Sequence, residues 1–190
     1  GFLMDGILLL EKQKNTSHYR IQPLPVNSGV FCLKKDRFQD IVWIGTDGQG
    51  VYLYSNPLYS IKSVVLGNYT EKIERPVRAI YLDDERTFWV GTKGNGILKI
   101  YDYEVDKNLS DCRAEVLTTS NSALGSNAVY CFARSHRNLL WIGEEEGLTY
   151  YSYREKRIKR LPVRIGNEEF KYIHDIYETA DSELWLASVG

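Results

Sequence analysis

The stretch Leu140-Trp141-Ile142-Gly143 decides the fold, because its tryptophan and the small residue two positions later recur at three other places. The other copies are Trp43-Ile44-Gly45, Trp89-Val90-Gly91 and Trp185-Leu186-Ala187. Successive tryptophans are 46, 52 and 44 residues apart. Self-similarity at a steady spacing indicates a repeat architecture, and here the period is about 47 residues.

Two further marks keep register with the tryptophans. Each tryptophan is preceded by two apolar residues spaced three apart: Val30 and Leu33, Val77 and Ile80, Val129 and Phe132, Ile173 and Ile176. The first three copies are followed by a glycine-bearing turn and a second apolar run, which begins at Gly50, Gly96 and Gly147, and residues 6–10 repeat that run ahead of the first copy. Each unit therefore reads as four short strands. Strand A carries the apolar pair, strand B the tryptophan, strand C follows the glycine turn, and strand D is the weakly patterned remainder, such as residues 60–66.

Four antiparallel strands at a period of about 40 to 50 residues are typical of the blade of a β-propeller. We predict an all-β fold, with residues 1–190 forming a single β-propeller region of about four blade-equivalents that is part of a larger propeller. The predicted units are a half-blade at 1–27, blades at about 28–71, 72–124 and 125–170, and a half-blade at 171–190. Two alternatives stay open for the ends. Strands 6–10 and 184–188 pair and close a four-blade ring, or the open edges pair with a second copy in a homodimer.

The repeated tryptophans and glycines are predicted to be structural. A tryptophan on strand B fills the gap between neighbouring sheets and buries about 200 Å². The residues assigned this structural role are Trp43, Gly45, Trp89, Gly91, Trp141, Gly143 and Trp185.

Composition limits the classes of function. The chain has 24 basic and 25 acidic residues and a formal net charge of −1, so no basic footprint for nucleic acid stands out. Its cysteines, Cys32, Cys112 and Cys131, lack metal-ligand spacing and are read as small buried apolar residues. The apolar start at residues 2–10 is interrupted by Asp5 and Gly6, which argues against a signal peptide or a membrane span. No metal or cofactor is predicted.

The third unit carries a family resemblance. Residues 124–132, then Leu140-Trp141-Ile142-Gly143 and Gly147-Leu148, resemble the two-component regulator propeller repeat, and the other units match it around their tryptophans. Ala187 departs from the pattern where glycine is usual, and Glu144-Glu145-Glu146 replaces a glycine-rich turn. The resemblance implies a periplasmic sensor region of a membrane-anchored hybrid histidine kinase, similar to the glycan-responsive regulators of gut Bacteroidetes.

Chain direction places the D–A and B–C connections on one side of every blade, where a ligand would meet the mouth of the channel. A mixed polar and aromatic rim there could hydrogen-bond to a sugar and stack on its ring. Ordinary solvated turns are the competing interpretation. The candidate ligand-binding residues are Asp47, Gln49, Arg75, Lys93, Asn95, Glu144, Glu145, Lys171, Tyr172 and His174.

Catalysis is not predicted for this region, because no nucleophile or zincin motif surrounds its three histidines. A propeller lyase or glycoside-cleaving enzyme is one alternative, and it would need an acid/base pair, for which only His174 with Glu144 is available. A scaffold that binds another protein on the same face is the other alternative. Glu144-Glu145-Glu146 has no accompanying calcium-loop spacing, which disfavours a metal site.

Overall fold

The computed structural model describes residues 6–55, 60–69, 71, 73–104 and 108–189. Three four-stranded sheets are formed, and each is one blade. Blade 1 contains β3 (Val30–Lys35), β4 (Ile41–Thr46), β5 (Val51–Ser55) and β6 (Ser60–Ser63). Blade 2 contains β7 (Val77–Leu82), β8 (Phe88–Thr92), β9 (Ile97–Ile100) and β10 (Ala114–Leu117). Blade 3 contains β11 (Val129–Arg134), β12 (Leu139–Glu144), β13 (Gly147–Ser152) and β14 (Arg157–Leu161).

Two hairpins flank the blades, and one small hairpin lies in a connection. The flanking hairpins are β1 (Ile7–Lys12) with β2 (Tyr19–Leu24) and β17 (Ile173–Glu178) with β18 (Leu184–Ser188). The connection after blade 3 holds β15 (Arg164–Ile165) and β16 (Glu168–Glu169), and a short 3-10 helix at Leu109–Asp111 precedes β10. No helix in the described part of the chain is long and apolar enough to cross a membrane. The part of the apolar start at residues 1–5 lies outside the described residues.

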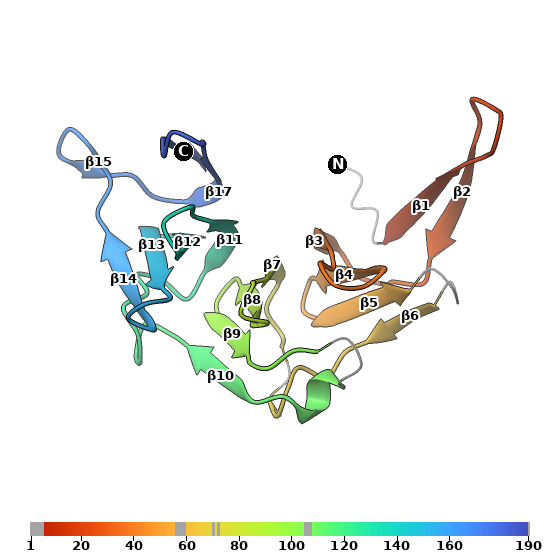
Figure 1. Ribbon diagram of the computed structural model, residues 1–190, viewed down its shortest axis with the longest axis horizontal. Coiled ribbons are helices and arrows are strands. Elements are labelled where there is room, and N and C mark those ends of the chain that lie inside the picture. The colour runs from red at the N-terminus through yellow and green to blue at the C-terminus, as the bar shows by residue number, and fades with distance from the viewer. Residues whose placement is uncertain (1–5, 56–59, 70, 72, 105–107, 190) are drawn as a thin grey trace.

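The sheets form an open arc (Figure 1). The A strands β3, β7, β11 and β17 are innermost, and the D strands β6, β10 and β14 lie at the periphery. Within each sheet the neighbouring strands pair antiparallel in sequence order, as the A-to-D assignment predicts. The prediction of an all-β fold of four-stranded antiparallel blades is confirmed.

The chain does not close on itself. β1 pairs with β2 and β18 pairs with β17, and the two hairpins lie at opposite ends of the arc (Figure 1). The four-blade ring, which required the strands at 6–10 and 184–188 to pair, is therefore wrong for this chain. Each flanking hairpin is a two-stranded sheet in the described part of the chain, and its assignment as half of a blade stays a prediction.

The apolar core lies between blades and not inside any one sheet. One cluster joins blades 1 and 2, a second joins blades 2 and 3, a third joins blade 3 to β17–β18, and a fourth joins β1–β2 to blade 1. Trp43, Trp89 and Trp141 are 3%, 0% and 9% exposed at equivalent places in the first three clusters. The predicted burial of these three tryptophans is confirmed. Trp185, which was assigned the same structural role, is 62% exposed, because no described sheet packs on the far side of β17–β18.

The glycine two residues after each buried tryptophan allows strand A of the next unit to lie close to strand B. A Cβ on Gly45 would lie 2.8 Å from the carbonyl oxygen of Val77, and one on Gly143 would lie 2.6 Å from the carbonyl oxygen of Ile173. Both carbonyls belong to the first residue of the A strand in the following unit, which a side chain at the glycine would push away. In the Trp-x-Gly repeat, the tryptophan therefore fills the space between blades and the glycine allows their backbones to approach.

Candidate ligand-binding site

The D–A and B–C connections of each blade are joined by one recurring backbone hydrogen bond. Asp47 N donates to Gly29 O (2.9 Å), Lys93 N donates to Pro76 O (2.9 Å), and Glu145 N donates to Ala128 O (3.1 Å). In each case the first residue after strand B reaches the residue just before strand A. The two sets of connections therefore form one continuous surface, called the loop face below.

Hydrogen bonds between units extend the loop face along the arc. The amides of Gly94 and Gly96 in blade 2 both donate to Asn127 O ahead of blade 3, at 2.9 Å each. Tyr172, ahead of β17, donates its amide to Glu145 O at 2.9 Å. These bonds fix the turns of successive blades relative to one another, so side chains on neighbouring turns are held at fixed separations.

Every A strand carries a β-bulge at its second residue. Pairing with strand B skips from Val30 to Cys32, from Val77 to Ala79, from Val129 to Cys131 and from Ile173 to Asp175. The unpaired residues are Phe31, Arg78, Tyr130 and His174, and we refer to these four residues as the bulge ring. Bulges redirect a side chain and are common beside functional sites. The bulge ring lies at the start of the four innermost strands, next to the loop face (Figure 1).

Members of the bulge ring contact one another across blades. The guanidinium carbon of Arg78 lies 3.8 Å from the centre of the Phe31 ring. The rings of Tyr130 and His174 stack with their centres 4.2 Å apart and an interplanar angle of 12°. Blades 1 and 2 thus present the guanidinium of Arg78 on the Phe31 ring. Blade 3 and the last hairpin present the imidazole of His174 on the phenol of Tyr130.

The two pairs are electrostatically linked through Tyr130. Burial raises the pKa of the Tyr130 phenol, the negative charge of Glu145 adds to the rise, and the positive charge of Arg78 opposes it. Arg78 from blade 2 and Glu145 from blade 3 therefore act on the same side chain. One end of the ring is cationic and aromatic, while the other offers a carboxylate beside two stacked rings.

The bulge ring was only partly predicted. His174 was a candidate, whereas Phe31, Arg78 and Tyr130 were not. The signal lies in the sequence, because each residue directly follows the first member of an apolar pair. The apolar pair predicts only that its two residues pack in the core. A bulge depends on the register between strands A and B, which the residue spacing within strand A does not give.

The candidates on blades 1 and 2 lie at the tips of the B–C turns or just before strand A. Asp47, Gln49, Arg75, Lys93 and Asn95 are all exposed. Gln49 donates to Asn27 O (3.3 Å) and accepts from the Tyr52 hydroxyl (3.2 Å). Asn95 is anchored through its backbone amide, which donates to Thr92 Oγ1 at 2.9 Å. The structure brings these residues onto the loop face, where their availability to a ligand stays a prediction.

The candidates on blade 3 and the last hairpin differ from one another in environment. Glu144 is 1% exposed, and its carboxylate accepts from the amides of Gly125 (3.0 Å) and Ser126. Burial raises the pKa of Glu144, and the hydrogen bond from Gly125 opposes that rise. This carboxylate is occupied in holding the loop ahead of blade 3.

Their neighbours on the loop face are more open. Glu145 accepts from the Ser126 hydroxyl at 3.1 Å, and the Lys171 ammonium pairs with Glu146 at 2.5 Å. Tyr172 is 44% exposed, and its φ of 54° turns the backbone just before β17. Glu145 and Tyr172 are therefore more exposed on the loop face than Glu144 is.

The pair required by the enzyme alternative is not assembled. The Glu144 carboxylate is held by backbone amides, the imidazole of His174 stacks on Tyr130, and no hydrogen bond joins the two side chains. Among the residues that the structure describes, no group of three or more metal-ligating side chains converges.

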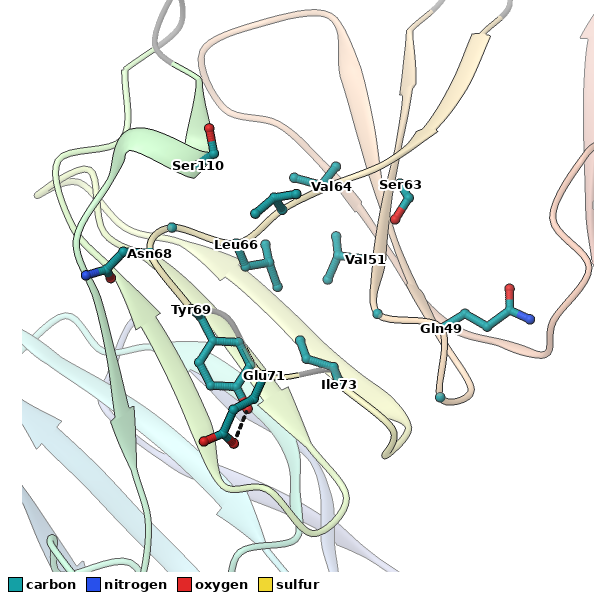
Figure 2. Close-up of a pocket in the computed structure, with 14 residues that line it drawn as sticks. Gln49, Val51, Ser63, Val64, Leu66, Asn68, Tyr69, Glu71, Ile73 and Ser110 are labelled. Carbon is teal, nitrogen blue, oxygen red and sulfur yellow. Dashed lines mark hydrogen bonds between the residues drawn. The ribbon is translucent and has the colours of Figure 1, made fainter.

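Two clefts open elsewhere between blades 1 and 2 and between blades 2 and 3. The first, of about 560 Å³, has apolar walls that include Val51, Val64, Leu66 and Ile73, with Gln49 at its rim (Figure 2). Among the described residues of its wall, the charged Glu71 accepts a hydrogen bond from Tyr69 at 3.3 Å (Figure 2).

The second cleft has a volume of about 820 Å³ and a charged lining. Its buried Lys99 ammonium donates to the Tyr151 hydroxyl at 2.9 Å and lies 4.8 Å from the Trp89 ring centre. Arg113 stacks on Tyr101 at 4.0 Å. Two cations of this cleft, Lys99 and Arg113, already lie against aromatic rings of the protein, and a third, Arg157, pairs with Glu155.

Comparison with solved structures places the fold. The chain aligns over 98% of its length with 26% of the extracellular domain described for the hybrid two-component system BT3049 of B. thetaiotaomicron, with a TM-score of 0.67 and 21% identity. It also aligns over 93% of its length with 26% of PorZ, a surface component of the type-IX secretion system of Porphyromonas gingivalis, with a TM-score of 0.62 and 15% identity. The chain spans about a quarter of the length of each of these structures.

No protein-family model matches the chain, and a sequence search finds no match among curated proteins. At identities of 21% and 15% the structural likeness establishes the fold. The compartment named for the BT3049 domain, extracellular, agrees with the periplasmic placement that the resemblance implies. The chain therefore has the fold of the extracellular domain of a Bacteroides hybrid two-component system, which is the fold that its tryptophan repeat predicts.

Proposed function

We propose that this chain is part of the periplasmic sensor propeller of a two-component sensor histidine kinase and that it recognises an oligosaccharide. The bulge ring is the observation that carries the proposal. Four successive units each turn one unpaired strand residue toward the same region, and three of those residues are rings: Phe31, Tyr130 and His174. Aromatic faces combined with a few fixed polar groups suit the alternating apolar and hydroxylated surfaces of a sugar.

The loop face supplies the polar groups. Gln49, Asn95 and Glu145 offer amide and carboxylate groups beside the bulge ring, and the backbone bonds between turns hold these residues in place. A ligand that touches several units would favour the blade arrangement in which all its contacts are made. We infer that the signal leaves the site as a change in propeller packing and reaches the kinase through the rest of the parent protein.

A glycan array with the 190-residue chain tests this proposal. We expect saturable binding to one class of oligosaccharide, and we expect His174→Ala to weaken it about threefold to tenfold through loss of a stacking ring. His136→Ala is the matched control, because His136 is also exposed but lies in an A–B turn on the opposite side of the blades.

The alternatives give different results in the same experiment. Binding to no oligosaccharide would contradict the proposal, and retention of a protein from a periplasmic extract, lost in His174→Ala, would favour the scaffold. Turnover of a bound oligosaccharide would favour the enzyme.

The ends of the arc expose apolar surface that complete blades cover. Leu8, Leu10 and Ile21 are 55%, 55% and 62% exposed at one end, and Tyr177 and Trp185 are 66% and 62% exposed at the other. We infer that these end faces pack against further blades in the parent protein, and that the isolated chain associates through them as a homodimer.

A further inference from the structure

We propose that the bulge ring selects an acidic oligosaccharide and that Arg78 binds its carboxylate. This inference rests on the proposed function and names the class of sugar. Its core is the juxtaposition of an unpaired guanidinium with stacked aromatic rings at one place on the inner strands.

Arg78 lacks a carboxylate partner. Its side chain is half-buried, its Nε is buried without a hydrogen-bond partner, and no ion pair joins it to any described residue. The contact that holds it is the Phe31 ring, 3.8 Å from the guanidinium carbon. Stacking on a ring fixes the plane of the guanidinium and leaves its edge, where the N–H groups lie, open to an acceptor. The buried Nε stays enclosed by protein, so a ligand would meet the terminal N–H groups of the half-buried side chain.

Several cations elsewhere in the described part of the chain have carboxylate partners, whereas Arg78 combines a ring contact with an unsatisfied Nε. Arg134 and Arg37 pair with Asp84, Arg160 pairs with Glu169, and Lys171 pairs with Glu146. The cations nearest to Arg78 along blade 2 are Arg75 and Lys93, which are exposed and form no ion pair with a described residue.

The opposite end of the bulge ring gives the ligand a direction. Glu145 lies near Tyr130, so this end disfavours a second acid group and can accept hydrogen bonds from hydroxyls. His174 is exposed and is supported from beneath by Tyr130, which gives a flat platform for a sugar ring. The expected pose places a uronate carboxylate on Arg78 in a bidentate pair and the next, hydroxylated ring over His174.

The test compares oligosaccharides that differ only in charge. Oligogalacturonate, alginate and hyaluronan fragments are each titrated against the 190-residue chain beside their own carboxyl methyl esters. We expect at least one acidic fragment to bind at least tenfold more tightly than its ester, with affinity that falls as salt is added. Arg78→Gln should abolish that preference, and Arg78→Lys should restore only part of it, because lysine keeps the charge but loses the planar bidentate contact.

Arg86→Gln is the matched control. Arg86 also lies over a phenylalanine ring, that of Phe38 at 5.2 Å, but it sits in an A–B turn on the far side of the blade. Circular dichroism and melting temperature verify that each variant is folded, and the ester comparison on the unaltered chain needs no variant.

Each outcome decides a separate point. Equal binding of acids and esters, or an unchanged preference in Arg78→Gln, would overturn the acidic specificity while carbohydrate recognition stands. Binding of neutral oligosaccharides alone would do the same. Failure of every oligosaccharide, acidic and neutral, would overturn the proposed function together with this inference.

Discussion

The indole Nε1 of Trp89 donates a 2.8 Å hydrogen bond to Oδ2 of Asp83, six residues earlier in the chain. The hydroxyl of Tyr153, from the following blade, donates to the same oxygen at 3.0 Å. Blade 1 repeats the arrangement, since Asp36 Oδ2 accepts from Trp43 (2.8 Å) and from Tyr103 of blade 2 (3.0 Å). In each case one buried carboxylate thus accepts hydrogen bonds from the tryptophan of its own blade and from a tyrosine of the next blade.

Replacing Asp83 with alanine leaves the buried indole N–H of Trp89 and the half-buried hydroxyl of Tyr153 without their acceptor. We expect a loss of about 2 to 4 kcal/mol of unfolding free energy, because each unsatisfied buried group costs about 1 to 3 kcal/mol. Urea denaturation measures the loss. Asp181→Ala, in the exposed turn of the last hairpin, is the control and should change stability by less than about 0.5 kcal/mol. Equal effects of the two variants would contradict the tie between blades.

The wedge itself is tested by Trp89→Ala. Trp89 is 0% exposed and packs on Tyr151 of the next blade with ring centres 4.9 Å apart. Truncation of a large buried aromatic costs about 3 to 5 kcal/mol, which should appear as a lower denaturation midpoint. Phe38→Ala is the control, since that ring is 40% exposed in the A–B turn of blade 1 and less packing is lost. An unmoved midpoint for Trp89→Ala would disprove the repeat register.

The close approach of blades is tested by Gly143→Ala. The added methyl would lie 2.5 Å from Cys131 Sγ and 2.6 Å from the carbonyl oxygen of Ile173, so β17 must move away. We expect about 1 to 3 kcal/mol of destabilisation, as for overpacked cores. Gly29→Ala is the control, because a Cβ there meets its nearest atom at an ordinary 3.5 Å. Similar melting temperatures for both variants would show that the contact between units is looser than described.

The tryptophan repeat predicts the blades because the period, the wedge and the glycine all act locally and leave marks in each unit. The aspartate that directly follows strand A is repeated in fewer units than the tryptophan. Asp36 and Asp83 occupy one position, but Ser135 stands there in blade 3, and Trp141 donates instead to Glu178 of the next unit at 2.6 Å. The polar partner of the indole changes between copies, so spacing alone does not reveal it.

The site is less predictable for the same reason. Turn tips such as Asp47 and Lys93 follow from chain direction, and the structure places them on the loop face. Glu144 stands three residues after its tryptophan, where Thr46 and Thr92 stand in blades 1 and 2, and like them it is buried. Its side chain turns inward to the amides of Gly125 and Ser126. Which residue of a turn points outward depends on the loop packed against it, and that loop comes from a distant part of the chain.

Two cysteines should be unreactive in the folded chain. Burial raises the pKa of the Cys32 thiol to about 11 and that of Cys131 to about 12, from an ordinary value of 9.0. Since the folded state keeps these protons longer, the thiols contribute stability below about pH 9 that is lost as pH rises toward those values. Iodoacetamide at pH 8, read by mass spectrometry, should label both cysteines in urea and neither in buffer.

The pH dependence has its own control. The difference in unfolding free energy between the unaltered chain and Cys131→Ala should shrink as pH rises from 9 toward 12, because the alanine variant lacks this titration. Rapid labelling of the native chain, or a difference that is constant with pH, would contradict the burial of the thiol.

The last prediction concerns the ends of the arc, where β1 and β18 each present an edge without a strand beside it in the described part of the chain. Unpaired edges flanked by apolar side chains recruit other strands. We expect the isolated 190-residue chain to sediment as a dimer at micromolar concentration, and Trp185→Lys to shift it toward monomer by placing a charge on the end face. Val65→Lys is the matched control, because Val65 is 62% exposed just after β6 of blade 1 and not on either flanking hairpin, and it should leave the dimer intact. Hydrogen exchange locates the contact, since pairing between copies should protect the amides of β1 and β18 at high concentration and release them on dilution. A monomer at every concentration, with those amides exchanging freely, would contradict the homodimer and leave the end faces for other blades of the parent protein.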